Sequence, residues 1–516
     1  MKMKKITQLG CSNSRYALSS FLGGALRIGR PVVFLRASLF NKKTSGSLYD
    51  HRGFATEAAD IRRISRDIEE RDVVIVGGGV VGLALACKIV HGASLLKSAA
   101  HNPKITIIER FPLAKPNVGP NDSPKAYANR VVSLTPASAE FLQEIGVWEH
   151  LDLTRVRPYK QIHVWDAVGG GMLNFDTPAD VGNMAYMVEL NNLSGAFMAK
   201  LQGTGIELLD NTSVTAIHHS QSEDVLDWPQ IGLDGGQLLR SRLLVGADGA
   251  NSPVRMFAGI ESMGWDYHQH GVVGTLTVTT NGAECAWQRF LPTGTFALLP
   301  LDATHSSMVW SLPPEFADKV RKLPLEQLGS LIQAALTASS EDVEFLLNQV
   351  KAGTLVTDDL DLGWRRPHPT PEGLPSITSV LPGSIAAFPL RLRHVNRYVV
   401  SRVALVGDAA HTIHPLAGQG LNLGLADAKS LGSHLSRGLL GGSDIGSLTL
   451  LQGYASERYW PNLAMLGATD KINRLFRAVD PILPTLRSFG FNLLEKHLPA
   501  SLKNAAVRIA TKGWPL

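Results

Sequence analysis

The sequence predicts an α/β protein with a Rossmann-like dinucleotide-binding domain, a second domain built on an antiparallel sheet, and a helical C-terminal tail. Three observations carry this prediction. A buried strand, a glycine-rich turn and a small-residue helix follow one another over residues 72–86. Short runs of alternating apolar and polar residues fill 259–395. A second buried strand, 403–407, then leads into another small-residue helix.

Composition narrows the range of functions. The chain has 516 residues, with 50 basic side chains, 45 acidic side chains and three cysteines. Residues 1–54 hold ten of the basic side chains and one acidic one, which leaves 40 basic and 44 acidic side chains for the rest. This distribution argues against nucleic-acid binding. Because the cysteines have no metal-ligand or disulfide spacing, no metal site is expected. No apolar run reaches the roughly 18 residues of a membrane-spanning helix.

The N-terminal segment, 1–54, has the composition of an organellar transit peptide. Residues 1–49 contain nine Lys or Arg and no acidic residue, which is typical of mitochondrial import signals. Arg52 precedes Ala55 by three residues and resembles the arginine of a matrix-protease site. We therefore expect a mitochondrial protein. A plastid address and a basic tail without an address are the alternatives.

A dinucleotide-binding fingerprint opens the first domain. Gly77, Gly79 and Gly82 have the spacing G-x-G-x-x-G between a strand and a helix. The first glycine permits a tight turn, the second lets the backbone approach a pyrophosphate, and the third lets helix and strand pack closely. Glu109 ends the next strand and is placed to accept hydrogen bonds from ribose hydroxyls. The polar stretch 91–103 is expected to be a surface insertion.

Helix and strand signals continue along the chain. A helix is predicted from an N-cap at Thr135 to Gly146, and a helical insert near 324–350. Alternating runs predict strands with one covered face at 272–278, 295–301 and 306–312. Three aromatic residues of this region are expected to fill its core, or else to line a ring pocket: Trp265, Phe290 and Trp310.

Two later segments favour FAD over a nicotinamide nucleotide. Asp248 and Gly249 form an Asp-Gly turn after a strand. Gly407 and Asp408 end a second strand, and the glycine-rich loop 418–422 then opens a helix. Asp408 is positioned for a ribitol hydroxyl. The loop backbone can lie against a flat ring, where the positive end of the helix dipole would stabilise the charge of a reduced flavin.

Together these motifs resemble the class A flavoprotein aromatic hydroxylases and, more narrowly, the ubiquinone-biosynthesis hydroxylases. The motifs are GxGxxG, GADG and GDAAHxxxPxxGQGxN. The narrower resemblance rests on further segments at 129–138, 145–148, 288–294, 298–300 and 473–476. It covers about 72–513, and the form of 127–131 is similar to that of mitochondrial members.

The resemblance implies noncovalent FAD and an aromatic-hydroxylase fold. In this family, reduced flavin and O2 form a C4a-hydroperoxide that delivers one oxygen to an electron-rich ring, here that of a polyprenylated phenol at C5. The resemblance also implies ferredoxin and ferredoxin reductase as the electron source, with NADPH left open. Further implied partners are other ubiquinone-biosynthesis proteins and the matrix face of the inner mitochondrial membrane. Alternatives are another flavin monooxygenase or epoxidase, a prenyl-chain reductase, and a non-catalytic prenyl-binding escort.

By motif position, the resemblance assigns site residues. Residues that would bind FAD are Gly77, Gly79, Gly82, Glu109, Arg130, Asp248, Gly249, Gly407 and Asp408. Residues that would frame the isoalloxazine are Pro415, Gly418, Gly420, Leu421 and Asn422. Arg130 and Asp248 would attend the phosphates. No acid or base is assigned, because the flavin supplies the chemistry. His411 and His414 are expected to pack the loop rather than to bind a metal.

Four parts of the chain follow from these assignments. They are the transit peptide, 1–54; an FAD-binding domain of 71–158, 181–258 and 396–450; a substrate domain of 159–180 and 259–395; and a tail, 451–516. The tail is basic and has an apolar face. It is expected to cap the flavin domain, to rest on an anionic membrane surface, or to do both.

Overall fold

The computed structural model describes residues 68–95, 103–117, 127–218, 228–279, 284–360, 369–477, 490, 503–505, 507–508 and 511. The expected transit peptide lies outside these residues, as does most of the chain after 477. Among the described helices, none is long and apolar enough to cross a membrane.

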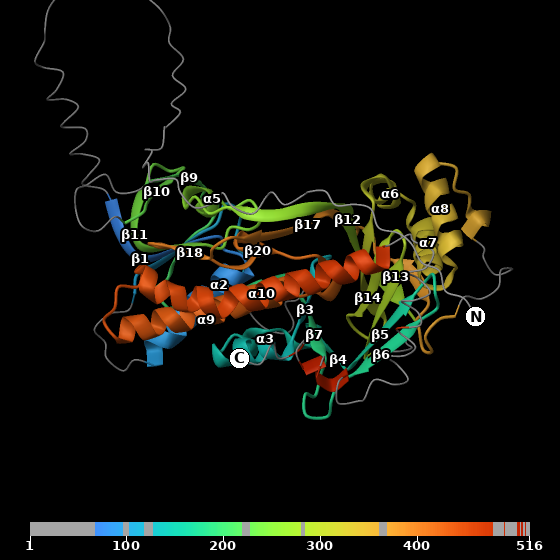
Figure 1. Cartoon of the computed structure of the whole chain (residues 1–516), viewed down its shortest axis with the longest axis horizontal. Helices are drawn as coiled ribbons and strands as arrows, with labels where there is room; N and C mark the ends of the chain where they lie inside the picture. The colour runs from blue at the N-terminus through green and yellow to red at the C-terminus, as the bar shows by residue number, and fades with distance from the viewer. Residues whose placement is uncertain are drawn as a thin grey trace, which may run out of the picture. The chain divides into compact units, whose positions relative to one another are not determined.

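The first sheet is the parallel sheet that the glycine fingerprint predicts (Figure 1). Five strands run parallel in the order β19, β11, β1, β2, β8, while β18, β10 and β9 add antiparallel pairs. The bounds are β1 Ile68–Val76, β2 Ile105–Ile108, β8 Glu207–Leu209, β9 Val214–His218, β10 Gln230–Leu233, β11 Leu238–Gly246, β18 Val399–Val400 and β19 Val403–Leu405. The carboxyl ends of β1, β11 and β19 therefore meet at one edge, where ligands bind in sheets of this kind.

Three long helices pack together beside this sheet. α2 (Val80–Leu95) lies against α9 (Gly420–Leu440), and α10 (Leu448–Arg477) lies alongside α9. A Cβ added at Gly92 would lie 2.0 Å from Ser436 Oγ, so the two helices approach too closely for a larger side chain. Because α2 continues to Leu95, the expectation of a surface insertion is wrong for residues 91–95.

The remaining described helices pack against α2 and α9, against β11, or against the second sheet. α3 begins after Thr135, whose side chain accepts a hydrogen bond from Ser138 N, and the chain turns at Gly146, as predicted. The bounds are α3 Pro136–Glu144, α4 Leu190–Leu201, α5 Pro253–Phe257, α6 Pro314–Val320, α7 Leu325–Thr337 and α8 Ser340–Ala352. Helices α7 and α8 confirm the predicted insert near 324–350.

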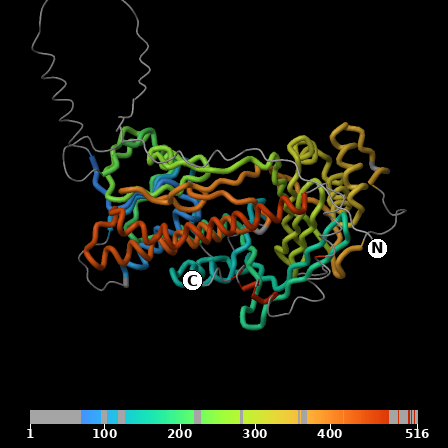
Figure 2. The backbone as a smooth tube through the Cα atoms, in the orientation of Figure 1, coloured from blue at the N-terminus to red at the C-terminus, as the bar shows by residue number. Residues whose placement is uncertain are grey.

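The second sheet has nine described strands in the order β20, β17, β12, β15, β14, β13, β5, β6, with β16 beside β12. Its bounds are β5 Gln161–Asp166, β6 Met172–Asp176, β12 Ser262–Val278, β13 Cys285–Leu291, β14 Gly294–Pro300, β15 His305–Leu312, β16 Ile377–Val380, β17 Ala386–Val395 and β20 His411–Thr412. Figure 2 shows the long pair β12 and β17 side by side. All pairs are antiparallel except β5 with β13, two strands separated by more than 100 residues and thus not joined by a hairpin.

A small antiparallel sheet joins the two larger ones. It consists of β3 (Val131–Leu134), β7 (Ala185–Glu189) and β4 (Val156–Tyr159). β3 carries the chain from the 127–130 segment into α3, and β7 leads directly into α4. β3 also contacts α9, so this sheet lies beside the helix that follows the glycine-rich loop.

The aromatic residues of the second sheet have three different environments. Trp310 is fully buried in its core, as expected. Phe290 stacks on Phe476 of α10, with ring centroids 3.7 Å apart. Trp265 is 44% exposed, so the prediction that it fills the core is wrong. This part of β12 lies at the protein surface, where the guanidinium of Arg474 lies over the Trp265 ring.

Candidate active site

The three glycines of the fingerprint have three different surroundings. Gly77 has φ +111°, and a Cβ there would lie 2.2 Å from the carbonyl oxygen of Ala247. A Cβ at Gly82 would lie 2.1 Å from the carbonyl oxygen of Gly77. At Gly79 an added Cβ meets no described atom within 4 Å. Gly77 and Gly82 therefore allow close packing within the protein, while Gly79 leaves its space open for a ligand.

Glu109 lies beside this turn. Its Oε2 accepts a hydrogen bond from Gly78 N at 2.8 Å, and its Oε1 accepts one from Phe111 N at 3.0 Å. The nearby N-terminus of α2 has no acidic residue in its first turn, so its free N–H groups are available to an anion. This end of the sheet suits a nucleotide with a pyrophosphate.

Asp408 lies at the end of β19. Its side chain is exposed to the pocket that it lines, while protein atoms on the other sides partly desolvate the carboxylate. This burial raises the pKa of Asp408, and the positive charge that His411 can carry lowers it. The preceding Gly407 N donates to Asp427 Oδ2 at 3.1 Å, which fixes the turn that presents Asp408.

Asp427 was not predicted from the sequence and is the centre of a buried polar network. Its Oδ2 lies 2.5 Å from His411 Nε2, and its Oδ1 accepts hydrogen bonds from Arg458 Nε and Asn462 Nδ2, both at 3.0 Å. The expectation that His411 packs the loop is confirmed by this contact. The network links the Gly407 turn to both α9 and α10.

Asn422 connects the start of α9 to β3 and α3 through its side-chain amide. Its Oδ1 accepts hydrogen bonds from Thr135 N at 3.0 Å and Ser138 Oγ at 2.8 Å, and its Nδ2 donates to Ser133 O at 2.8 Å and Gly418 O at 3.2 Å. Because these bonds occupy its amide, the side chain is in place to hold the 418–422 loop against β3 and α3. Its expected contact with a flavin stays a prediction.

Asp248 is held behind the pocket. Its Oδ2 accepts a hydrogen bond from Val254 N at 3.1 Å, and its buried Oδ1 has no partner in the described part of the chain. Burial raises its pKa. Arg255, which sequence reasoning overlooked, donates to the carbonyls of Ala409 at 2.9 Å and Ala250 at 2.8 Å. It thereby ties the GADG turn to the GDAAH segment.

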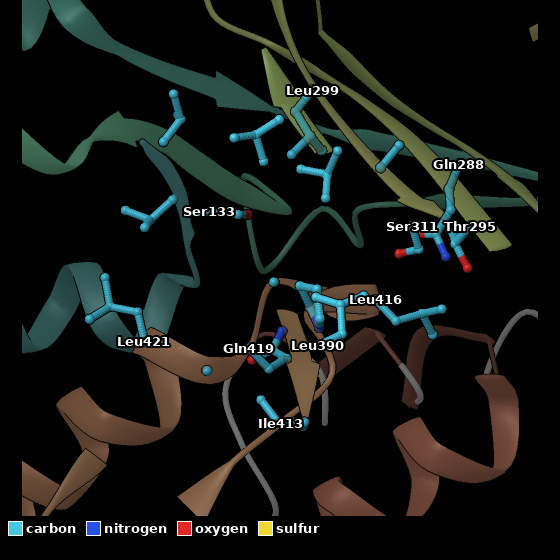
Figure 3. Close-up of a pocket in the computed structure, with 18 of the residues that line it drawn as sticks. Ser133, Gln288, Thr295, Leu299, Ser311, Leu390, Ile413, Leu416, Gln419 and Leu421 are labelled. Atoms are coloured by element: carbon cyan, nitrogen blue, oxygen red, sulfur yellow. The ribbon is translucent and has the colours of Figure 1, made fainter. Parts of the chain in front are cut away.

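One pocket of about 1500 Å³ connects these turns to the second sheet. Predicted site residues that line it are Gly79, Arg130, Gly249, Asp408, Pro415, Gly418, Gly420 and Leu421. Those that support the lining from outside are Gly77, Gly82, Glu109, Asp248, Gly407 and Asn422. Figure 3 shows Leu416, Gln419 and Leu421, from the segment that leads into α9, on one side, and Gln288, Thr295, Leu299 and Ser311 of the second sheet on the other.

The second-sheet wall of the pocket is the part that sequence reasoning missed. Its apolar side chains come from alternate positions on neighbouring strands: Ile162 and Val164 on β5, Leu173 and Phe175 on β6, and Ala297 and Leu299 on β14. Alternation along each strand was visible in the sequence. Which of the two faces lines a pocket depends on strand pairing, and no local pattern reveals that.

His414 does not form a metal site with its neighbours. Its Nδ1 accepts a hydrogen bond from Leu416 N at 3.1 Å, and its ring packs edge-on against Tyr267. Over the residues that the structure describes, no group of three or more His, Cys, Asp or Glu is arranged to hold a metal ion.

The residues present fit the FAD that the sequence predicts. The open space at Gly79, the anion-accepting start of α2 and the exposed carboxylate of Asp408 lie on one continuous pocket or at its edge. The pocket then continues along an apolar wall, which leaves room for a second molecule beside a flat ring. This is the arrangement that redox chemistry on a bound substrate requires.

Comparison with known proteins agrees with this geometry. The FAD binding domain family matches residues 70–347 and 374–462. The mitochondrial ubiquinone biosynthesis monooxygenase COQ6 of Xenopus tropicalis is 36% identical over 450 residues, which are 86% of this chain and 93% of that protein. The protein of the same name from Homo sapiens is 35% identical over 453 residues, or 86% and 92%.

Solved structures show the same fold at low identity. A probable FAD-dependent monooxygenase of Pseudomonas aeruginosa, pqsL, has a TM-score of 0.59 and 22% identity, covering 82% of this chain and all of its own. The p-nitrophenol 4-monooxygenase PnpA of Pseudomonas putida has a TM-score of 0.61 and 20% identity, covering 87% and 100%. From the family match and the two close relatives, this chain belongs to the ubiquinone biosynthesis monooxygenase family and is an FAD-dependent monooxygenase.

Proposed function

We propose that this monooxygenase hydroxylates the aromatic ring of a polyprenylated phenol in ubiquinone biosynthesis, at ring carbon C5. The observation that carries the proposal is the continuous pocket of about 1500 Å³, which begins at the nucleotide turns and continues along an apolar wall. A flavin and a ring with an apolar chain can share such a pocket. The relatives named above act in ubiquinone biosynthesis by name.

In this proposal, the residues of the chain position the flavin and the substrate and exclude water from the pocket. Bound FAD supplies the oxygen chemistry, and the hydroperoxyflavin route is part of the proposal. Gly418 and Gly420 leave the loop backbone accessible on the pocket side, while Leu416 packs against the apolar cluster that contains Phe290. An apolar enclosure of this kind keeps water away from the oxygen that is to be transferred to the substrate.

We also propose a mitochondrial location on the matrix face of the inner membrane. Support comes from the last turns of α10, where Ile472 and Leu475 line the pocket and are 41% and 43% exposed. Basic side chains at Lys471 and Arg474 lie beside them. An apolar rim with cations suits an anionic membrane surface, from which a prenylated substrate could enter. Ferredoxin with its reductase, and other ubiquinone-biosynthesis proteins, are the partners of this proposal.

The test is an isotope experiment on the purified full-length protein. We expect it to retain FAD and, when reduced by ferredoxin and its reductase, to place one atom of ¹⁸O2 on the ring of a prenylated phenol. NMR of the product would give the ring position, and mass spectrometry would separate a hydroxylated ring from a chain epoxide or a reduced chain. Flavin-loaded protein that consumes O2 without labelling the ring would contradict the proposal. Asp408→Ala serves as the flavin-deficient control.

A further inference from the structure

The apolar wall of the pocket has one polar area. It consists of Gln288 on β13, Thr295 on β14 and Ser311 on β15, three neighbouring strands. Since Phe296 pairs with Trp310 in the antiparallel register, Thr295 and Ser311 lie next to each other. Figure 3 shows the three polar side chains gathered at one side of the pocket.

These polar groups are buried but unused. Thr295 is 5% exposed and Ser311 is 2% exposed, while Gln288 is partly buried. Over the described residues, no hydrogen bond involves the side chain of any of the three, although all three line the pocket. Buried polar groups are nearly always hydrogen-bonded, so these are available to a ligand or to water within the pocket.

Along the same strands the wall becomes apolar. On β13 the next pocket-facing residue after Gln288 is Ala286, and on β14 Thr295 is followed by Ala297 and Leu299; β5 and β6 add Ile162 and Phe175. A molecule with a polar end and an apolar chain therefore matches this wall in one direction only. Reversing it would bury its polar end against hydrocarbon without partners.

The polar area also lies near the 415–420 loop. Phe290, whose register partner is Thr295, packs with Val164 and Phe476, and Leu416 of the loop contacts this cluster. A ring whose oxygen reached Thr295 and Ser311 would thus lie between the sheet and the 415–420 loop. The chain on that ring would extend toward Leu299 and Phe175.

We infer that Gln288, Thr295 and Ser311 form a head-group subsite that hydrogen-bonds the hydroxyl of the phenol and so determines how the ring is presented. The inference rests on the proposed function and assigns specificity-determining residues to it. All three groups are uncharged and can each donate or accept, which suits a phenol hydroxyl. The subsite supplies orientation, and the apolar remainder of the wall supplies affinity for the chain.

The test compares two probes on the FAD-loaded full-length protein, 2-geranylphenol and geranylbenzene, which differ only in the hydroxyl. Binding is followed by the change in flavin absorbance. We expect wild type to prefer the phenol, and Thr295→Val, Ser311→Ala and Gln288→Met each to weaken phenol binding about fivefold, as one lost hydrogen bond implies. Affinity for geranylbenzene should stay nearly constant. Ser306→Ala is the matched control, because Ser306 is buried on β15 but does not line the pocket.

The possible outcomes distinguish a failure of the subsite from a failure of the proposed function. A wild-type protein that binds geranylphenol no better than geranylbenzene would contradict both the phenol substrate and the subsite. A wild-type protein that prefers and hydroxylates geranylphenol, with variants that keep the preference, would overturn the subsite alone. Variants that weaken both probes equally, or that lose FAD, would show a structural role and overturn the subsite as well.

Discussion

Replacing Asp427 with asparagine tests whether the buried network holds the flavin-binding turn. The Asp427 carboxylate is fully buried and is contacted by Gly407 N, His411, Arg458 and Asn462. Burial alone would raise its pKa, but the charge and hydrogen bond of His411 and the charge of Arg458 outweigh this and lower it to about 2. The stabilisation is therefore complete above pH 3.8 and is lost as the pH falls toward 2.

The expected magnitude at neutral pH follows from the contacts. Asp427→Asn keeps the shape of the side chain but leaves Arg458, whose side chain is 13% exposed, without its counter-charge. Breaking a buried ion pair in this way costs about 3–5 kcal/mol of the free energy of unfolding. Loss of the charged acceptor for Gly407 N should also weaken FAD binding about tenfold or more, since a hydrogen bond to a charged group contributes about 1.5–3 kcal/mol.

The assay is denaturant unfolding at pH 7 together with FAD titration followed by flavin fluorescence. The control is Asp318→Asn, which removes a surface ion pair with Arg321 at 3.4 Å and should change stability by less than about 1 kcal/mol. If Asp427→Asn unfolded like the control and bound FAD like wild type, the network would have no part in holding the turn.

Three further experiments test other parts of the structure. Gly79→Val should fold but lose FAD, because its side chain enters open pocket space, whereas Gly82→Ala should lower stability through contact with a backbone oxygen 2.1 Å away; thermal melts and flavin content distinguish the two. The pKa values of His394 and His414 are each lowered to about 4, first by burial and then by nearby cations, while the unfolded chain takes up these protons near pH 6.5; unfolding free energy measured against pH should therefore fall from pH 6.5 to 4. Tyr454→Phe removes a buried 2.7 Å hydrogen bond to Leu405 O and should cost about 1–3 kcal/mol in denaturant unfolding; an unchanged midpoint would show that α10 does not need this bond.

Local sequence patterns predicted the glycine-rich turn and its flanking strand and helix correctly. The spacing of Gly77, Gly79 and Gly82 describes contacts within a few residues of one strand and one helix, so it predicted the turn and the parallel sheet. The N-cap at Thr135 and the strands 272–278 and 306–312 are local signals of the same kind. Helix α2 was the local error, because the polar stretch 91–103 was expected to be a surface insertion, whereas residues 91–95 continue α2 and Gly92 packs on α9.

The residues that form and support the pocket are brought together by contacts between segments far apart in the sequence. Asn422 bonds to a carbonyl 289 residues away, and Phe476 stacks on Phe290 from the other end of the chain. Arg255 and Asp427 hydrogen-bond the backbone of the GDAAH segment, which the sequence had already singled out. No sequence spacing reveals these two contacts. Trp265 was misjudged because alternation does not tell which end of a strand leaves the core.

By itself, the sequence determined the fold class, the FAD motifs and the family resemblance, because each depends on residues that interact with near neighbours or on a spacing that one turn requires. Only the tertiary structure decided which face of the second sheet lines the pocket, and that Gln288, Thr295 and Ser311 share a polar area within it. The reason is that strand register and helix packing bring these residues together from separate segments, and a one-residue shift in register would turn every one of these side chains to the opposite face.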